Sequence, residues 1–284
     1  MSSPEPTPPT IGVFDSGFGG LTVLRALIAR MPRARFSFLG DTARLPYGSK
    51  SRRTIARYAV ESAQFLVREQ GAEFLVIACN TASALALDAI QDAVPVPVLG
   101  VIEPGAASAR AASQTGDVLV IATDATVRSH AYSEACQAQG LRALEKACPL
   151  LVPLVEEGWT DHPVTAEVIR IYLNELNADA AARGLRPDTL VLGCTHYPLL
   201  RPLLERSVPP GVRVIDSAEA AAESAARLFN GRVRPAGDQP NAQTAGQPTE
   251  IHCFATDSVE KFQHLGSRFL GYPVGPVQLI DLGG

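Results

Sequence analysis

The sequence predicts an α/β fold in which parallel β-sheets are covered by helices on both faces. Short apolar runs rich in β-branched residues recur along the chain, and longer segments with helical spacing of apolar residues lie between them. A length of 284 residues is enough for a large hydrophobic core and favours two domains over one. Strands that alternate with helices in this way are typical of parallel sheets.

The expected strands follow one another through the whole chain. In order they are IGVF, RFSFLG, EFLVIA, PVPVLGVI, DVLVIA, TLVLG, VRVID and IHCFAT. The segment from Val164 to Ala182 illustrates the helices between them, because its apolar residues Val168, Ile171 and Leu176 repeat at helical spacing. A last helix is expected after IHCFAT, in the stretch DSVEKFQHLGSRFLG.

Two segments are expected to lie outside the folded core. Residues 1–10, MSSPEPTPPT, are predicted to form a disordered tail, and residues 231–250 are rich in Pro, Gly and Gln and are predicted to form an exposed loop. The tail has neither the cationic patch nor the apolar stretch of a signal peptide, and no run approaches the roughly 18 apolar residues of a membrane span. We therefore expect a cytoplasmic protein.

Charge and cysteine content narrow the class of function. The net charge is −4 without blocks of like charge, so we expect neither a nucleic acid nor a membrane as partner, but a small molecule. The 5 cysteines are far apart and include no CxxC pair, which argues against a disulfide framework and a zinc ribbon. We expect the cysteines to be reduced.

Two segments of the chain echo each other. FLVIACNTASALAL and TLVLGCTHYPLL are both apolar strands that end in a cysteine, followed by polar residues and an apolar helical stretch. Cys79 and Cys194 thus occupy equivalent places, at the strand ends where open parallel sheets bind ligands.

Small polar side chains follow most of the predicted strands. Many of them are expected to cap helices, since Ser, Thr, Asp and Asn are the preferred capping residues. They are Asp15, Ser16, Asp41, Thr42, Cys79, Asn80, Thr81, Glu103, Thr123, Asp124, Cys194, Thr195, His196, Asp216 and Ser217. The two cysteines are the exceptions, because cysteine is not a preferred cap.

Two glycine-containing turns could bring the backbone close to a ligand. GVFDSGFGGLTVL joins a strand to a helix but is neither GxGxxG nor a phosphate loop. Its glycines permit close approach, and the helix N-terminus behind them favours an anionic group such as a carboxylate. DTARLPYGSKS is a similar turn. Each is either a simple tight turn or a source of N–H groups for a ligand.

The residues alone leave three interpretations of Cys194. It is a buried core residue, as we expect for Cys136, Cys148 and Cys253, or it ligates a metal together with Cys79 and His196, or it belongs to an active site. The spacing of this cysteine and histidine set does not match the usual zinc sites. We therefore expect no metal.

Six motifs give the chain a resemblance to a known family. They are GVFDSGFGGLTVL, GDTARLPYG, ACNTASA, PLVEEG, VLGCTHYPLL and VIDSA, which together span about residues 11–218, and a weaker match lies in the final strand and helix. In this order they resemble the glutamate racemases, cofactor-independent members of the aspartate/glutamate racemase superfamily. The resemblance implies two pseudo-symmetric lobes with the active site in the cleft between them. Lobe 1 would comprise residues 11–103 and 214–284, and lobe 2 residues 104–213.

The family interconverts L- and D-glutamate with two acid/base groups, one on each face of the Cα atom. Carried over by the motifs, these groups are Cys79, assigned to D-glutamate, and Cys194, assigned to L-glutamate. Asp15 and His196 match the auxiliary residues that move protons beside them, and Glu156 matches a further acid, although Glu157 is its neighbour. The resemblance implies no cofactor.

The family's substrate contacts also carry over to this chain. They correspond to Asp15, Ser16, Tyr47, Gly48, Asn80, Thr81, Thr195 and His196, with Thr123 and Thr126 in second rank. The threonine-rich loop IATDATVRSHAY departs from the family at Ala122 and His130, where small residues, mostly glycine, are usual. The shape of that loop is therefore left open.

The resemblance further implies a homodimer that supplies D-glutamate for peptidoglycan synthesis, and so for cell wall biogenesis and cell shape. Two other interpretations remain. One is a racemase of the same superfamily that acts on aspartate or another small acid. The other is a non-catalytic sensor, since two facing thiols also suit a redox or ligand switch.

Overall fold

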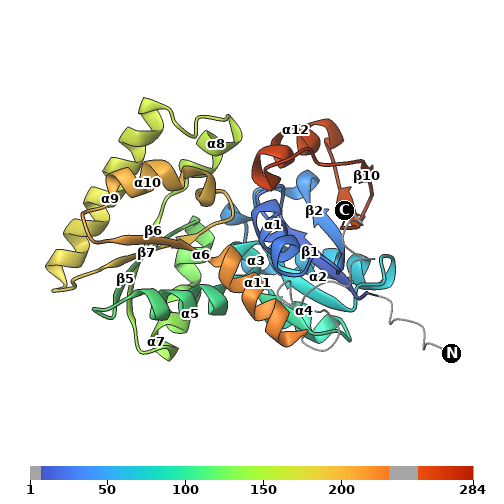
Figure 1. Ribbon diagram of the computed structural model, residues 1–284, viewed down its shortest axis with the longest axis horizontal. Helices are drawn as coiled ribbons and strands as arrows, with labels where there is room; N and C mark the ends of the chain where they lie inside the picture. Colours follow the sequence, from blue (N-terminus) through green and yellow to red (C-terminus); the bar gives the residue numbers. More distant parts are fainter. Residues whose placement is uncertain (1–7, 230–248, 284) are drawn as a thin grey trace, which may run out of the picture.

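The computed structural model describes residues 8–229 and 249–283 and consists of two parallel β-sheets flanked by helices, as the sequence predicts. Figure 1 shows the two sheets in separate lobes that lie side by side. The predicted exposed loop of residues 231–250 falls almost wholly outside the described residues, as do residues 1–7 of the predicted tail. None of the helices that the structure describes is long and apolar enough to cross a membrane.

The first lobe is built on a six-stranded sheet with the strand order β10-β9-β2-β1-β3-β4. All of its neighbouring strands are parallel. The strands are β1 (Thr10–Asp15), β2 (Arg35–Gly40), β3 (Phe74–Ile77), β4 (Val98–Gly100), β9 (Ile251–Ala255) and β10 (Val277–Leu279). The chain therefore returns to this sheet at its C-terminal end, where α12 (Val259–Leu270) connects β9 to β10.

The second lobe holds a four-stranded sheet with the strand order β6-β5-β7-β8, again parallel throughout. Its strands are β5 (Asp117–Ala122), β6 (Arg142–Ala147), β7 (Thr189–Gly193) and β8 (Arg213–Asp216). Because neighbouring strands run the same way, their carboxyl ends meet at one edge in each lobe.

The helices lie between consecutive strands and cover both sheets (Figure 1). Those on the first lobe include α1 (Leu21–Arg30), α2 (Arg52–Arg68), α3 (Asn80–Leu85) and α4 (Leu87–Ala93), with the short turns η1 (Thr42–Arg44) and η2 (Tyr47–Ser49). The others are α5 (Ile102–Ala112), α6 (Asp124–Ser129), α7 (Ala131–Ala138), α8 (Leu151–Glu156), α9 (Pro163–Ala182), η3 (Tyr197–Leu200), α10 (Arg201–Ser207) and α11 (Ser217–Leu228).

Local sequence signals explain where several helices begin. The side chains of Ser51, Thr123 and Asp216 each accept a hydrogen bond from a backbone N–H in the first turn of α2, α6 and α11. The inner strands β1, β3, β5 and β7 are buried at every residue. This is the pattern expected of central strands in parallel sheets.

The structure corrects two predicted boundaries. VRVID was placed in lobe 1 from residue 214 onward, but β8 pairs with β7 in the second sheet, with Val214 opposite Leu190. Thr10 was placed in the tail, but it is buried and pairs with Arg35 as the first residue of β1. The division of the remaining segments into two lobes stays a prediction, since α11 packs against both α1 and α5.

Asp188, before β7, gives a testable link between pH and stability. Its burial would raise the pKa, but hydrogen bonds from Ser113 Oγ and the N–H groups of Gln114 and Thr115 outweigh this and lower it from 3.8 to about 2. A lowered folded-state pKa stabilises the protein above pH 3.8, and that stability is lost as the pH falls toward 2. We expect Asp188→Asn to lower the free energy of unfolding by about 1 kcal/mol at neutral pH, because solvent screens this partly exposed carboxylate.

Urea unfolding of the wild type and of Asp188→Asn, followed from pH 7 to pH 2, checks this prediction. The difference between the two proteins should disappear toward the acid end of the range. A difference that stays constant over the whole range would contradict the role given to the Asp188 charge.

Candidate active site

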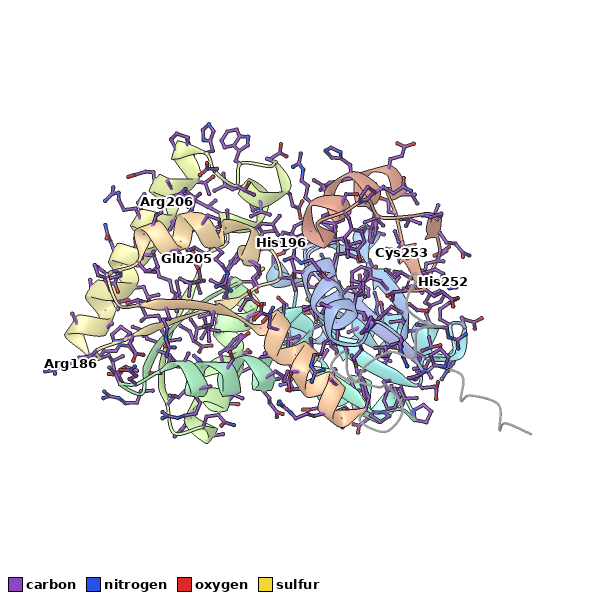
Figure 2. All side chains as sticks on the ribbon, viewed as in Figure 1. Arg186, His196, Glu205, Arg206, His252 and Cys253 are labelled. Carbon is purple, nitrogen blue, oxygen red and sulfur yellow. The ribbon has the colours of Figure 1, made fainter. Side chains whose placement is uncertain are left out.

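The carboxyl ends of three strands converge where the two lobes meet. β1 ends at Asp15, β3 ends just before Ala78 and Cys79, and β7 ends immediately before Cys194. Both cysteines are buried, with exposed fractions of 4% and 6%. Figure 2 shows His196 between the two lobes. The quasi-repeated segments of the sequence thus bring one cysteine from each lobe to this boundary.

Cys79 lies at the start of α3 and takes part in a small hydrogen-bonding cluster. Its Sγ accepts from the N–H of Ala82 at 3.4 Å, in the position of a helix cap, and the thiol donates to Ser16 Oγ at 3.4 Å. Asp15 lies beside this cluster, and its Oδ2 accepts from the Gly17 N–H at 3.0 Å. Its Oδ1 is buried and has no hydrogen-bond partner among the described residues.

Burial dominates the protonation of this first cluster. Burial, and after it the Asp15 carboxylate, raises the pKa of Cys79 to about 12. The hydrogen bonds with Ser16 and the Ala82 N–H lower this pKa by less than burial and Asp15 raise it. Burial also raises the pKa of Asp15, against the lowering by His196 and by backbone N–H groups. Cys79 is therefore a neutral thiol at neutral pH.

Cys194 lies beside a histidine and glutamate pair. His196 Nδ1 is 3.9 Å from Cys194 Sγ, and His196 Nε2 is 3.2 Å from Glu156 Oε1. Glu156 is the last residue of α8, and it rather than Glu157 makes this contact. The edge of the His196 ring packs against Phe269 of α12, with ring centroids 5.1 Å apart.

The second cluster contains an ion pair, whereas Cys79 in the first is a neutral thiol. Burial would lower the pKa of His196, but its hydrogen bonds to Cys194 and Glu156 outweigh burial and raise the pKa to about 10. Burial would raise the pKa of Glu156, but His196 and then Lys261 lower it. His196 is therefore an imidazolium at neutral pH, held against a carboxylate.

Gly19 lets the two clusters approach each other across the lobe boundary. A Cβ atom at this position would collide with Thr195 Oγ1 and would lie 2.7 Å from His196 Nδ1. Thr22 Oγ1 donates to the carbonyl oxygens of Gly19 at 2.9 Å and Thr195 at 3.4 Å. The glycine-rich turn after β1 thus packs directly on the segment that carries Cys194 and His196.

We expect Gly19→Ala to lower the activity of this site by about tenfold, because the added methyl displaces Thr195 and His196. Gly17→Ala is the matched control, since a Cβ atom at Gly17 would meet only Leu45 Cδ2, at an ordinary 3.6 Å. Steady-state kinetics on both variants checks this prediction. Equal activity of the two variants would argue against close packing at Gly19.

Hydroxyl and amide groups make a second connection between the lobes. The hydroxyls of Thr81, Thr123 and Thr126 lie 2.9 to 3.3 Å from one another. Tyr132 donates to Asn80 Oδ1 at 2.7 Å, while Asn80 Nδ2 is buried without a hydrogen-bond partner among the described residues. These groups are polar but uncharged, as suits the binding of carboxylates by hydrogen bonds.

The turn that carries Tyr47 and Gly48 is fixed by a hydrogen bond to Asp41. Tyr47 OH donates to Asp41 Oδ2 at 2.5 Å, and Arg44 Nε lies 2.8 Å from the same oxygen. Burial and the Asp41 carboxylate raise the pKa of Tyr47, so its hydroxyl stays protonated. A Cβ atom at Gly48 would lie 2.9 Å from Thr123 Cβ, which places this turn against the threonine group of the second lobe.

The structure thus places the predicted residues in neighbouring groups at one lobe boundary. Tyr47 differs in that its hydroxyl is already bonded to Asp41. Sequence reasoning missed Tyr132, Lys261 and Phe269. Tyr132 lies within the quoted loop IATDATVRSHAY, but nothing in the sequence predicts its contact with Asn80.

His130, one of the two departures from the family pattern, joins α6 to α7 in a left-handed conformation with φ of 59°. Glycine adopts this conformation without strain, which explains why small residues suit the position. The His130 side chain reaches Glu145, with Nδ1 3.5 Å from Oε2. Ala122 ends β5 and is fully buried.

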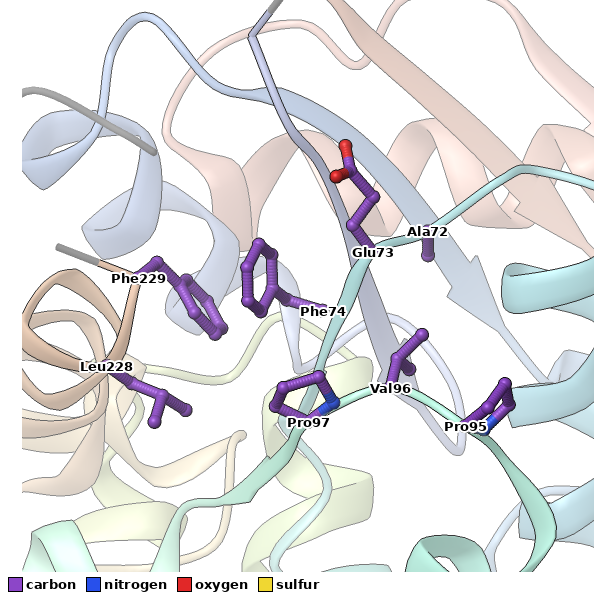
Figure 3. Close-up of a pocket in the computed structure, with 8 residues that line it drawn as sticks. All are labelled: Ala72, Glu73, Phe74, Pro95, Val96, Pro97, Leu228 and Phe229. Carbon is purple, nitrogen blue, oxygen red and sulfur yellow. The ribbon is translucent and has the colours of Figure 1, made fainter. Parts of the chain in front are cut away.

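Two further observations concern ligands other than an amino acid. Among residues 8–229 and 249–283, no cluster of three or more His, Cys, Asp or Glu side chains could hold a metal ion. A cavity of about 500 Å³ lies beside Phe74, Pro97 and Phe229 (Figure 3). It adjoins the start of β3, at the edge of the sheet opposite Cys79, and so belongs to another part of the surface.

A family model for Asp/Glu/Hydantoin racemases matches residues 20–225 of the chain. A glutamate racemase of Koribacter versatilis is 54% identical over 290 aligned residues, which cover 97% of this chain and 98% of that protein. A glutamate racemase of Geobacter metallireducens is 45% identical and covers 96% of each chain.

Solved structures of similar proteins have the same fold. A glutamate racemase isoform of Bacillus anthracis superposes with a TM-score of 0.85 at 34% identity, over 96% of this chain and 98% of the other. A glutamate racemase of Francisella tularensis, solved in complex with D-glutamate, superposes with a TM-score of 0.84 at 31% identity, over 97% of this chain and 98% of the other.

Proposed function

The chain belongs to the aspartate/glutamate racemase family, among the glutamate racemases, and from that premise we propose that it interconverts L- and D-glutamate. It is an isomerase that acts on the Cα atom of the amino acid. The observation that carries the proposal is the pair of buried cysteines, one at the end of β3 and one at the end of β7, that the lobes bring to their common boundary.

We propose that Cys79 and Cys194 act on opposite faces of Cα. Racemisation removes a proton from one face and returns one to the other, and a single group would tend to return the proton to the face it came from. The two cysteines differ in surroundings, since Cys79 is a neutral thiol beside Asp15 and Cys194 lies beside the His196 imidazolium. We therefore assign Cys79 as the acid and Cys194 as the base when L-glutamate is the substrate.

In the direction from L- to D-glutamate, the Cys194 thiolate takes the α-proton and the Cys79 thiol gives its proton to the opposite face. The His196 imidazolium, which lies beside Cys194 and is held by Glu156, would stabilise negative charge on this sulfur when Cys194 acts as the base. Between turnovers Cys194 gives up the proton that it took and the Cys79 thiolate regains one, and we assign Asp15 the relay of that proton from solvent to Cys79. In the reverse direction the two thiols exchange roles.

The polar groups around the cysteines are proposed to bind the substrate. Ser16, Asn80, Thr81 and Thr195, with the backbone of Tyr47 and Gly48, offer hydrogen bonds to the two carboxylates, and Thr123 and Thr126 extend this set. Asp15 would accept from the ammonium group. Keeping that group protonated and binding the α-carboxylate with uncharged donors stabilises the carbanion that forms at Cα.

The biological setting is part of the proposal. D-glutamate is a component of peptidoglycan, so the product would serve cell wall biogenesis and thereby cell shape. All 5 cysteines are free, which suits the reducing cytoplasm. We propose the homodimer on the family resemblance alone.

Polarimetry of the purified protein with L-glutamate, without added cofactor, tests the activity. The expected result is loss of optical rotation to zero, with D-glutamate as the product. A parallel assay with L-aspartate distinguishes a racemase for the shorter acid. Stable rotation with both amino acids would contradict the proposal and favour the non-catalytic sensor.

A further inference from the structure

Helix α12, in the C-terminal return to the first lobe, reaches the acid/base group of the second lobe. Lys261 and Phe269 both lie on α12, about two turns apart along the helix. Lys261 Nζ lies 3.6 Å from Glu156 Oε2, and Phe269 packs against the His196 ring. Between them, Arg268 lies against Gly158, where a Cβ atom would collide with its guanidinium group.

Lys261 completes a chain of polar contacts that crosses the lobe boundary. Glu156 uses one carboxylate oxygen for His196 and the other for Lys261. Lys261 Nζ also lies 5.6 Å from the centroid of the Phe18 ring, in the glycine-rich turn after β1. The ammonium group thus touches both the turn that carries Asp15 and the acid that holds His196.

The position of α12 is held by contacts with the first lobe. Thr42 Oγ1 donates to the Asp257 carbonyl at 2.5 Å, next to the start of the helix. Phe262, the neighbour of Lys261, is fully buried and packs on Phe18 and Phe38, with ring centroids 6.2 Å and 5.9 Å away. Because the backbone at Phe262 is anchored in the core, Lys261 is presented at a defined place.

We propose that Lys261 is a positioning residue for racemisation, which orients Glu156 toward His196 on the Cys194 side of the site. This inference rests on the proposed function. Lys261 touches neither cysteine and acts through Glu156. Lys261 lies 3.6 Å from one Glu156 oxygen and so favours the orientation in which the other oxygen faces His196.

The charges around Glu156 predict how the loss of Lys261 changes the pH dependence of the activity. His196 and Lys261 face Glu156, while Cys194, Asp15 and Glu156 act on His196. Loss of the ammonium charge removes a cation that favours the Glu156 carboxylate, so this acid takes up a proton at higher pH. The activity of the variant should therefore fall at a higher pH on the acid side than that of the wild type.

We expect Lys261→Met to lower kcat/KM about fivefold at neutral pH and to move the acid limb of its pH profile upward by about half a unit. The decrease must be equal for L- and D-glutamate, because the equilibrium constant between enantiomers is one. Lys261→Arg keeps the charge and the reach, and should restore both the rate and the profile.

Lys146→Met is the matched control, because it also removes a lysine that pairs with a glutamate. Lys146 Nζ lies 2.7 Å from Glu175 Oε2, and this pair joins β6 to α9. It should leave the pH profile unchanged. A Lys261→Met enzyme with wild-type kcat/KM and profile would overturn the inference, as would a Lys261→Arg enzyme no better than Lys261→Met. If the wild type itself fails to racemise glutamate, the proposed function has failed instead.

Discussion

Replacing either Cys79 or Cys194 with serine is expected to lower kcat/KM for glutamate racemisation by at least about a thousandfold. Serine differs from cysteine by one atom and fits the same space, but its hydroxyl is a far weaker acid than a thiol. It can neither form the base needed on one face of Cα nor give up a proton readily on the other. The measurement is the initial rate with each enantiomer, by polarimetry or by enantiomer-resolving chromatography.

The proposed mechanism needs each cysteine in both directions, since one acts as base while the other acts as acid. The loss in kcat/KM should therefore be the same for L- and D-glutamate within each variant. Cys253→Ala serves as control, because Cys253 is a buried free cysteine of β9. Among the described residues, its side chain has no hydrogen bond to either cluster. A Cys79 or Cys194 variant that keeps near-normal rates would remove that cysteine from the proposed pair.

Replacing Asp15 with asparagine is expected to lower the activity by about a hundredfold and to stabilise the fold at the same time. Asparagine keeps an oxygen for the Gly17 N–H but cannot carry a proton to Cys79. Burial raises the folded-state pKa of Asp15 above 3.8, so ionisation of this carboxyl destabilises the fold as the pH rises. The variant removes this cost at neutral pH.

Thermal unfolding at several pH values and racemisation kinetics check the two effects together. The gain in melting temperature should be present at pH 7 and should vanish below about pH 4. Asp188→Asn is the matched control, since the same chemical change there is expected to lower stability without loss of activity. An Asp15→Asn enzyme with wild-type activity would contradict the relay.

Most of the fold follows from local patterns in the sequence. The predicted strands are present because continuous apolar runs mark central strands, as in β5 and β7. β6 and β10 were not predicted, because neither is a continuous apolar run. β6, RALEKA, lies at a sheet edge, is largely half-exposed and carries charged residues, while β10 has only 3 residues. Edge strands of this kind lack the apolar signal on which the prediction depends.

The candidate site could be predicted residue by residue but not as a set of contacts. The echo between the segments of Cys79 and Cys194 pointed to the pair before any contact was known. Lys261 could not be found in the same way, because it is one charged residue on an amphipathic helix. Its partner Glu156 lies far earlier in the chain. Only the folded chain brings the Lys261 side chain of α12 to Glu156 at the end of α8.

Racemisation of L-glutamate in deuterated water, stopped early, tests the two-cysteine mechanism most directly. In the proposed mechanism Cys194 takes the α-proton on one face, and Cys79 delivers deuterium on the other. The account predicts that newly formed D-glutamate carries deuterium at Cα while the remaining L-glutamate is still protiated. D-glutamate that keeps the original proton, or deuterium that enters L-glutamate as fast as product forms, would indicate a single base and contradict the account.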